Sequence, residues 1–102
     1  MAGPHVVLAE LAPPAERRQA FRTLALDFAQ DCQRLEPGCR QFQVIAMAGE
    51  ASTLLFIEVY DSAEAFEVHR GSAHLARFQQ AFSTWQVAER PLRQGLLLEP
   101  QP

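Results

Sequence analysis

The chain has no lysine and no asparagine, and it has only two cysteines, Cys32 and Cys39. Without lysine, Schiff-base chemistry and a lysine general base are excluded. Two cysteines at this spacing do not supply the four close sulfur and nitrogen ligands that a zinc site normally needs, so we interpret both as small apolar core residues. The sequence also lacks a glycine-rich phosphate loop, a dinucleotide fingerprint and a serine or cysteine nucleophile in a recognisable elbow.

Long apolar segments are also absent. No run approaches the length that crosses a membrane, and residues 1–4 lack the features of a signal peptide. We therefore expect a cytoplasmic protein with no membrane partner. The formal net charge of −3 argues against nucleic acid as a partner, because phosphate-backbone binding needs a clustered positive surface. Arg17, Arg18 and Arg22 do cluster, and they form either a solvated helix face or a contact for an anionic ligand.

The length of 102 residues predicts one domain over residues 1–102. Hydrophobic residues make up 48% of the chain and charged residues 21%, which is typical of a folded protein and excludes disorder. A domain of this size has a limited core, so further burial against a partner would stabilise it.

The first third of the chain predicts a strand and a long helix. The apolar run His5–Leu11 ends at Pro13-Pro14, and prolines favour the first turn of a helix. Between Glu16 and Leu35, apolar residues recur at steps of three and four, as in an amphipathic helix. The buried stripe of that helix would comprise Phe21, Leu24, Ala25, Phe28, Cys32 and Leu35. Pro37-Gly38 then ends the helix.

The middle of the chain predicts a hairpin and a short helix. The two strands are Cys39–Ala48 and Thr53–Tyr60, separated by a turn near Gly49-Glu50. Asp61 is the predicted N-cap of the helix, with Glu64 three residues later in a capping-box pattern.

The last third predicts a second helix and a strand. Gly71 ends the short helix, Ser72 caps the next one, and Arg93–Leu98 forms the final strand. The second helix would bury Leu75, Phe78, Phe82 and Trp85. The order β-α-β-β-α-α-β predicts an α+β fold, a ferredoxin-like sandwich with an antiparallel sheet and helices on one face.

The strand Thr53–Tyr60 is apolar on both faces. Leu54 and Phe56 point one way, and Leu55, Ile57 and Val59 point the other way. A single layer of helices covers only one face, and leaving the other in water would forgo several kcal/mol at about 25 cal/mol per Å². A second copy of the sheet is the simplest cover, so we expect a homodimer.

Four polar residues stand in apolar surroundings: Glu58, Tyr60, His69 and His74. Glu58 shares a strand face with Phe56 and Tyr60, where an ionised carboxylate needs a partner or a raised pKa. His69 lies on the same helix face as Phe66, and His74 lies in the first turn of the next helix. A carboxylate, a phenol and two imidazoles can together transfer protons near neutral pH.

Structural interpretations of these residues remain open. Glu58 and a histidine could form only a satisfied buried pair, Tyr60 could simply end a strand, and His74 could lie at the surface. His5 is expected at an edge or interface. A metal triad of His69, His74 and Glu58 can be written, but the two histidines flank Gly71 and lack the i, i+4 spacing of zinc hydrolases. We therefore expect no metal and no cofactor.

The segments Glu36–Phe42, Phe56–Tyr60, Ala65–His69 and Ser72–Phe78 resemble the antibiotic biosynthesis monooxygenase family. The similarity runs in the same order over nearly the whole chain. It implies membership of the dimeric α/β barrel superfamily, in which two ferredoxin-like subunits pair and each has a pocket between helices and sheet.

The family includes quinol-type monooxygenases that need neither metal nor flavin, haem-degrading enzymes and an isomerase of a phosphorylated dione. The haem-degrading branch relies on an asparagine, a tryptophan and an iron-binding histidine. This chain has no asparagine, and it aligns His69 with the tryptophan and Gln79 with the iron ligand. The isomerase branch shares Glu58, Tyr60, His69 and His74, but its late first-helix histidine is replaced here by Ala29-Gln30-Asp31.

The leading hypothesis is a cofactor-independent monooxygenase of quinol-type or polycyclic aromatic molecules. His69 would act as base or hydrogen-bond partner, Glu58 as its orienting carboxylate, and Tyr60 and His74 as polar groups facing the substrate. The apolar wall would comprise Phe28, Phe42, Phe56, Phe66, Phe78 and Trp85. Two alternatives remain: an isomerase or tautomerase of a small carbonyl compound, and a non-catalytic ligand-binding module of a stress response.

Overall fold

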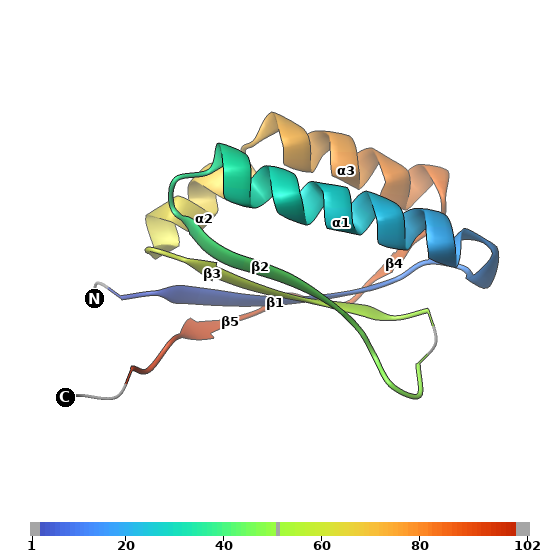
Figure 1. Cartoon of the computed structure of the whole chain (residues 1–102), viewed down its shortest axis with the longest axis horizontal. Coiled ribbons are helices and arrows are strands. Elements are labelled where there is room, and N and C mark those ends of the chain that lie inside the picture. Colours follow the sequence, from blue (N-terminus) through green and yellow to red (C-terminus); the bar gives the residue numbers. More distant parts are fainter. Residues whose placement is uncertain (1–2, 51, 100–102) are drawn as a thin grey trace.

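The computed structural model describes residues 3–50 and 52–99. Strand β1 is followed by a 3₁₀ turn (η1) and the long helix α1, then by the hairpin β2–β3, the helices α2 and α3, and two short strands (Figure 1). The bounds are β1 His5–Ala12, η1 Ala15–Arg17, α1 Arg18–Leu35, β2 Cys39–Ala46, β3 Leu54–Tyr60, α2 Ala63–Arg70, α3 Ala73–Thr84, β4 Ala88–Glu89 and β5 Arg93–Leu96.

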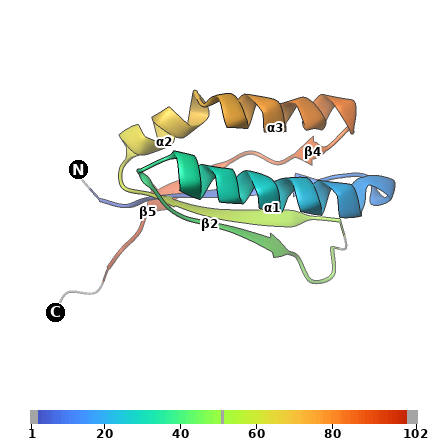
Figure 2. The ribbon, with the colours of Figure 1, turned by 45° about the horizontal axis from the view of Figure 1, so that its top comes forward.

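The described residues form two layers, with all three α-helices on one face of the sheet (Figures 1 and 2). The strand order is β2-β3-β1-β4, and β5 also pairs with β1. Every pairing is antiparallel. The predicted ferredoxin-like α+β fold is therefore confirmed, including the split arrangement in which β3 lies between β1 and β2.

Helix α1 presents most of its predicted stripe to the sheet. Phe21, Ala25, Phe28, Ala29 and Cys32 are buried, because steps of three and four bring them to one face. The prediction for Leu35 is wrong: its side chain is 47% exposed, whereas the next residue, Glu36, is only 4% exposed. None of the helices within the described ranges is both long and apolar enough to cross a membrane.

Serine side chains cap both short helices. The Ser62 side chain accepts a hydrogen bond from the Ala65 amide, so the prediction of Asp61 as N-cap is wrong. Asp61 instead accepts a 2.6 Å hydrogen bond from the Arg40 Nε. Ser72 caps α3 as predicted, accepting from the Leu75 amide. The Ser72 cap lies at the short break between α2 and α3.

The C-terminal segment is divided into two strands rather than one. Ala88–Glu89 pairs with the end of β1, and Arg93–Leu96 pairs with its beginning. Arg90-Pro91-Leu92 separates them, and a proline cannot donate a ladder hydrogen bond. The predicted final strand was therefore correct at its start but missed β4 and ran two residues too far.

Strand β3 directs alternate side chains toward and away from the helices. Leu54, Phe56, Glu58 and Tyr60 are buried, and the pocket and aromatic contacts place them on the helical side. This orients Glu58 and Tyr60, whose face the sequence left undecided. On the opposite face Leu55 and Ile57 stay half-buried, while Val59 is already buried within a single chain.

Candidate functional site

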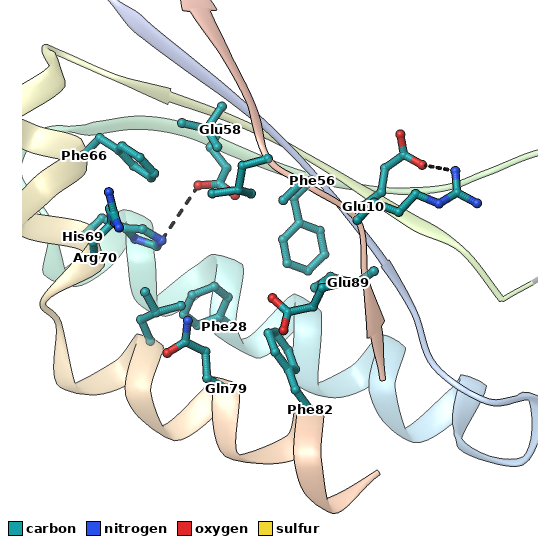
Figure 3. Close-up of a pocket in the computed structure, with 16 residues that line it drawn as sticks. Glu10, Phe28, Phe56, Glu58, Phe66, His69, Arg70, Gln79, Phe82 and Glu89 are labelled. Carbon is teal, nitrogen blue, oxygen red and sulfur yellow. Dashed lines mark hydrogen bonds and ion pairs between the residues drawn. The ribbon is translucent and has the colours of Figure 1, made fainter. Parts of the chain in front are cut away.

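A pocket of about 300 Å³ lies between the helices and the sheet (Figure 3). Its walls come from β1, β3, all three helices and the segment around β4. The apolar lining consists of Val7, Ala9, Leu11, Phe28, Phe56, Phe66, Leu75, Phe82 and Leu92, and the polar lining of Glu10, Glu58, His69, Arg70, Gln79, Glu89 and Arg90. The lining thus combines apolar walls with a comparable share of polar groups, and a concave site of this kind can hold a small molecule that carries both.

Glu58 lies at one end of this pocket with almost no exposure to solvent. Its side chain is only 4% exposed because β3 turns it beneath the helices. The Tyr60 hydroxyl donates a 2.6 Å hydrogen bond to Glu58 Oε1, and His69 Nε2 lies 3.8 Å from the same oxygen. Burial raises the pKa of Glu58 to about 7; the bond from Tyr60 opposes this rise and the charge of Glu36 adds to it. The group can therefore change protonation near neutral pH.

His69 lies in the last turn of α2 and contacts carboxylates through both ring nitrogens. Nδ1 lies 3.0 Å from Glu36 Oε2, and Nε2 faces Glu58. Burial lowers the pKa of His69, while the hydrogen bond to Glu36 acts in the opposite direction. In the neutral ring the proton belongs on Nδ1, where Glu36 accepts it. Nε2 then carries a lone pair on the side of the ring that faces the pocket.

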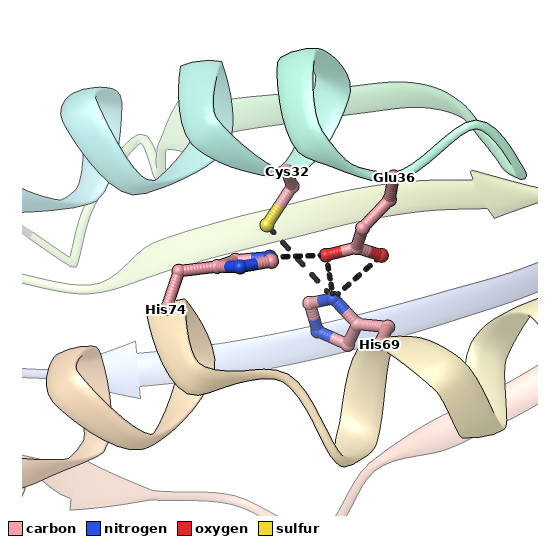
Figure 4. Close-up of side chains that lie close together, drawn as sticks. All are labelled: Cys32, Glu36, His69 and His74. Atoms are coloured by element: carbon pink, nitrogen blue, oxygen red, sulfur yellow. Dashed lines mark hydrogen bonds and ion pairs between the residues drawn. The ribbon is translucent and has the colours of Figure 1, made fainter.

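Glu36 is the carboxylate that joins the two histidines (Figure 4). It follows the last residue of α1, and its side chain turns inward to accept from His69 Nδ1 and from His74 Nε2. This role of Glu36 was not predicted from the sequence. Glu58 was the carboxylate expected to orient His69, whereas Glu36 lies in a turn, where an exposed side chain is the ordinary expectation.

Gly38 explains how the turn holds Glu36 so close to α2. A Cβ atom at this position would lie 2.6 Å from the Cβ of Ala65, a distance that real contacts do not reach. The Gly38 carbonyl also accepts a 2.8 Å hydrogen bond from the Asp61 amide. Only glycine allows this approach, which sets the position of Glu36 relative to His69.

Cys32 completes the group below the helices. It is fully buried, and its Sγ lies 3.8 Å from His69 Nδ1. Burial raises the pKa of Cys32 well above the usual thiol range, and the charge of Glu36 adds to that effect. The side chain was interpreted as an apolar filler. Its position on the buried stripe is as expected, but its contact with a histidine could not be read from the stripe.

The remaining predicted substrate-binding residues divide between wall and core. Phe28, Phe56 and Phe66 line the pocket. Phe42 and Phe78 are buried in the aromatic core, where Phe28 and Phe78 stack with ring centroids 4.2 Å apart. The other two residues lie elsewhere. Trp85 is partly buried beneath the guanidinium of Arg17, and His74 is turned toward Glu36.

The outer part of the pocket is charged. Arg90 Nη1 lies 2.7 Å from Glu10 Oε2, and its Nη2 lies 3.3 Å from Glu50. Arg70 and Glu89 lie on the same lining (Figure 3). Exposed charged groups thus stand at the rim, while the aromatic walls, Glu58 and His69 lie inside, so a bound aromatic molecule would leave water as it enters.

The arrangement as a whole can accept and return a proton. Glu36 holds the Nδ1 side of His69, which leaves Nε2 as a base and stabilises the imidazolium once Nε2 is protonated. Glu58 faces the same nitrogen and can hold a second proton. Cys32, Glu36, His69 and His74 also form a group with the donor atoms for a metal ion.

These features define an α+β protein with a buried acid–base group at the end of an apolar pocket. The family model of the antibiotic biosynthesis monooxygenases matches residues 4–81. The chain therefore belongs to the antibiotic biosynthesis monooxygenase family, which supports a general monooxygenase-like function. The expectation drawn from the sequence resemblance is confirmed at this level.

Solved structures agree with the fold. A Deinococcus radiodurans protein with the provisional name of an antibiotic biosynthesis monooxygenase has a TM-score of 0.86 at 20% identity, covering 96% of both chains. A Caulobacter crescentus protein with the same provisional name has a TM-score of 0.87 at 23% identity, covering 96% of this chain and 92% of its own. The Rv0793 protein of Mycobacterium tuberculosis has a TM-score of 0.76 at 27% identity, covering 98% of both. No curated protein sequence matches significantly.

Proposed function

We propose that this protein is a monooxygenase that oxidises a small quinol-type or related aromatic molecule by deprotonating it in the pocket, without a cofactor. The observation that carries the proposal is the pair of His69 Nε2 and Glu58 Oε1, 3.8 Å apart and buried at the end of a cavity with aromatic walls. Membership of the antibiotic biosynthesis monooxygenase family supports a general monooxygenase-like function.

The first step is proton transfer from a phenolic hydroxyl or an acidic C–H of the substrate to His69 Nε2. Glu36 stabilises the resulting imidazolium, because its carboxylate accepts from Nδ1. The substrate anion is electron-rich and reduces dioxygen without a metal or flavin. An apolar wall without water raises the free energy of this anion. The rise is smaller when the charge of the anion lies near the imidazolium.

The oxygen atoms and electrons of the reaction balance when the substrate loses two hydrogen atoms. The carbanion form of the substrate bonds to one oxygen of dioxygen, and the His69 imidazolium returns its proton to the other oxygen, which gives a hydroperoxide. Loss of water from that hydroperoxide leaves a carbonyl group on the former C–H carbon. One oxygen atom remains in the product, the other leaves as water, and the substrate supplies all four electrons.

The pocket volume limits the size of the substrate. At about 300 Å³ the cavity lies at the lower end of ligand pockets, which range from about 300 to 1,000 Å³. Phe28, Phe56 and Phe66 offer ring faces and edges to an aromatic ligand. This favours compact quinols over extended polycyclic molecules.

The test is oxygen uptake on a panel of quinols and anthrones, with product analysis under ¹⁸O₂. We expect one labelled oxygen in the product, and a loss of about 10²–10⁴-fold in turnover for His69→Ala. Glu67→Gln is the matched control, because Glu67 is on the same helix and its side chain is 65% exposed. Turnover of a substrate without oxygen consumption would instead favour the isomerase alternative. Unchanged turnover in His69→Ala would remove His69 from the mechanism.

We further propose that the sheet faces not covered by helices pair in a homodimer. The register places Val6 opposite Val59 and Leu8 opposite Ile57 on that face. Ile45, which pairs with Leu55 on the same face, is 37% exposed. Apolar side chains therefore continue across three strands of a surface that has no helical cover.

A further inference from the structure

Four buried side chains with metal-binding atoms meet beneath the helices, beside the pocket. One ligand atom from each of Cys32, Glu36, His69 and His74 lies within 4.8 Å of all the others (Figure 4). All four residues are buried, with exposures of 0% to 9%. Such a concentration of thiol, carboxylate and imidazole groups in a protein interior needs a physical reason, because each is costly to bury alone.

The group is held by local structure at three points of the chain. Cys32 and Glu36 are one helical turn apart, and the Glu36 amide still donates to the Cys32 carbonyl at 3.1 Å. His69 lies in the last turn of α2 and His74 in the first turn of α3. The Ser72 cap fixes the break between those helices, so the two histidines converge although Gly71 separates them along the chain.

We propose that Cys32, Glu36, His69 and His74 bind a divalent transition-metal ion, with zinc as the best fit. Zinc takes four tetrahedral ligands from cysteine, histidine and carboxylate groups. Tetrahedral bonds of about 2.0–2.3 Å separate neighbouring ligand atoms by about 3.3–3.8 Å. Here Sγ and His69 Nδ1 are 3.8 Å apart, and Nδ1 and Glu36 Oε2 are 3.0 Å apart, so small movements suffice.

Charge also favours a divalent ion. A thiolate, a carboxylate and two neutral imidazoles carry a formal charge of −2, which one divalent cation neutralises within the buried group. The sulfur and nitrogen donors disfavour calcium and magnesium, which prefer oxygen ligands and more of them.

Glu58 supplies a second layer to the site. If His69 binds the ion through Nδ1, its proton is on Nε2, which faces Glu58 Oε1 at 3.8 Å. The Tyr60 hydroxyl holds that carboxylate in turn, at 2.6 Å. A carboxylate behind a ligating histidine is a common means of orienting the ring.

All four ligand positions come from the protein, so the ion would be enclosed and would connect the end of α1 to the α2–α3 junction. This is the arrangement of a structural or regulatory metal rather than a catalytic one. The inference is tested independently of the oxygen chemistry proposed above, because a direct measurement of metal binding does not depend on turnover.

The experiment uses the full chain without a histidine tag, stripped with a chelator. Zn²⁺ is titrated by calorimetry, and Co²⁺ is added as a spectroscopic probe. We expect one ion per chain, a thiolate-to-cobalt charge-transfer band with intense tetrahedral d–d bands, and a higher melting temperature with Zn²⁺.

The variants Cys32→Ser and His74→Ala test the ligands, and Cys39→Ser is the matched control. Cys39 is also buried and unpaired with another cysteine, but its Sγ donates to the Gln41 carbonyl outside the group. Losing a second-layer partner typically costs 10–100-fold in affinity, so losing a ligand should weaken Zn²⁺ binding by at least about 100-fold. Cys39→Ser should bind like the wild type.

Circular dichroism in chelator shows whether each variant is folded, and Cys32→Ser keeps nearly the native volume if His74→Ala does not fold. An octahedral cobalt spectrum, sub-stoichiometric binding, or equal affinity in Cys32→Ser and wild type would overturn the site. Oxygen uptake by a protein that binds no zinc would contradict only the metal site. Zinc binding by a protein whose metal-free form shows no turnover would contradict only the monooxygenase.

Discussion

Glu36 is the residue whose replacement most directly tests the arrangement of the site. The change Glu36→Gln keeps the size and shape of the side chain but removes its charge. Glu36 accepts from both His69 and His74 inside the protein, and its side chain is only 5% exposed. The variant is compared with wild type in chelator, so that metal binding does not contribute.

The expected loss can be worked from the contacts. A hydrogen bond to a charged group contributes about 1.5–3 kcal/mol, and a neutral one about 1 kcal/mol. Both imidazoles contact Glu36 Oε2, and His69 Nδ1 also lies 3.2 Å from Oε1. In glutamine one oxygen is replaced by an NH₂ group that cannot accept, so the two charged bonds become neutral and His69 loses its contact with a second acceptor. We expect the free energy of unfolding to fall by about 2–4 kcal/mol, a substantial part of the roughly 5–15 kcal/mol of a whole domain.

The assay is urea and thermal unfolding followed by circular dichroism, with ¹⁵N NMR of the imidazoles as a second readout. A loss of this size lowers the melting temperature by roughly 10–25 °C in a domain of this length. Glu67→Gln removes an equivalent charge from an exposed ion pair with Arg70 and should change stability by less than about 0.5 kcal/mol. If the two variants unfold alike and the His69 tautomer is unchanged, the central role given to Glu36 is refuted.

Three further predictions follow from particular contacts. Gly38→Ala should lower the free energy of unfolding by about 1–3 kcal/mol, because the added Cβ would overlap Ala65. Gly95→Ala is the control, because its added Cβ meets no atom within 4 Å. Equal unfolding curves for the two variants would contradict the packing argument. Between pH about 4.5 and 7 the folded state keeps a proton on Glu58 that the unfolded chain has released. The free energy of unfolding of the wild type should therefore fall by up to about 3 kcal/mol relative to that of Glu58→Gln as pH rises. Parallel profiles of stability against pH for the two proteins would refute this prediction. Native mass spectrometry should give the mass of two chains, and Ile57→Asp should shift it toward one; a wild-type monomer at micromolar concentration would rule out the dimer.

Much of the fold could be predicted because its signals are local. The periodicity of three and four residues in α1 and the alternation in β3 depend only on neighbouring residues, and both are present in the structure. The start of α2 was harder to predict, because Asp61 and Ser62 are both good N-caps. In the structure Ser62 caps the helix, and Asp61 accepts instead from Arg40, which is distant in the sequence.

The site could be predicted only in part, for the opposite reason. Burial of Glu58 follows from alternation along one strand, but the contacts of Glu36 span 33 residues to His69 and 38 to His74. Local spacing contains no such information. His69 and His74 flank Gly71 and lack the i, i+4 spacing of a single helix, yet the break between α2 and α3 brings both of them onto the Glu36 carboxylate.

His69 gives the two proposals a testable relation, because one ring cannot serve both at once. As a base, His69 needs a proton on Nδ1, held by Glu36, and a lone pair on Nε2. As a zinc ligand through Nδ1 it must carry its proton on Nε2, which then has no lone pair for substrate. Zn²⁺ should therefore inhibit oxygen uptake in proportion to its occupancy in the wild type, and leave Cys32→Ser active at the same zinc concentration. Full occupancy with undiminished uptake would show that His69 is not both the base and a ligand, and Glu58 would be the remaining candidate for the base.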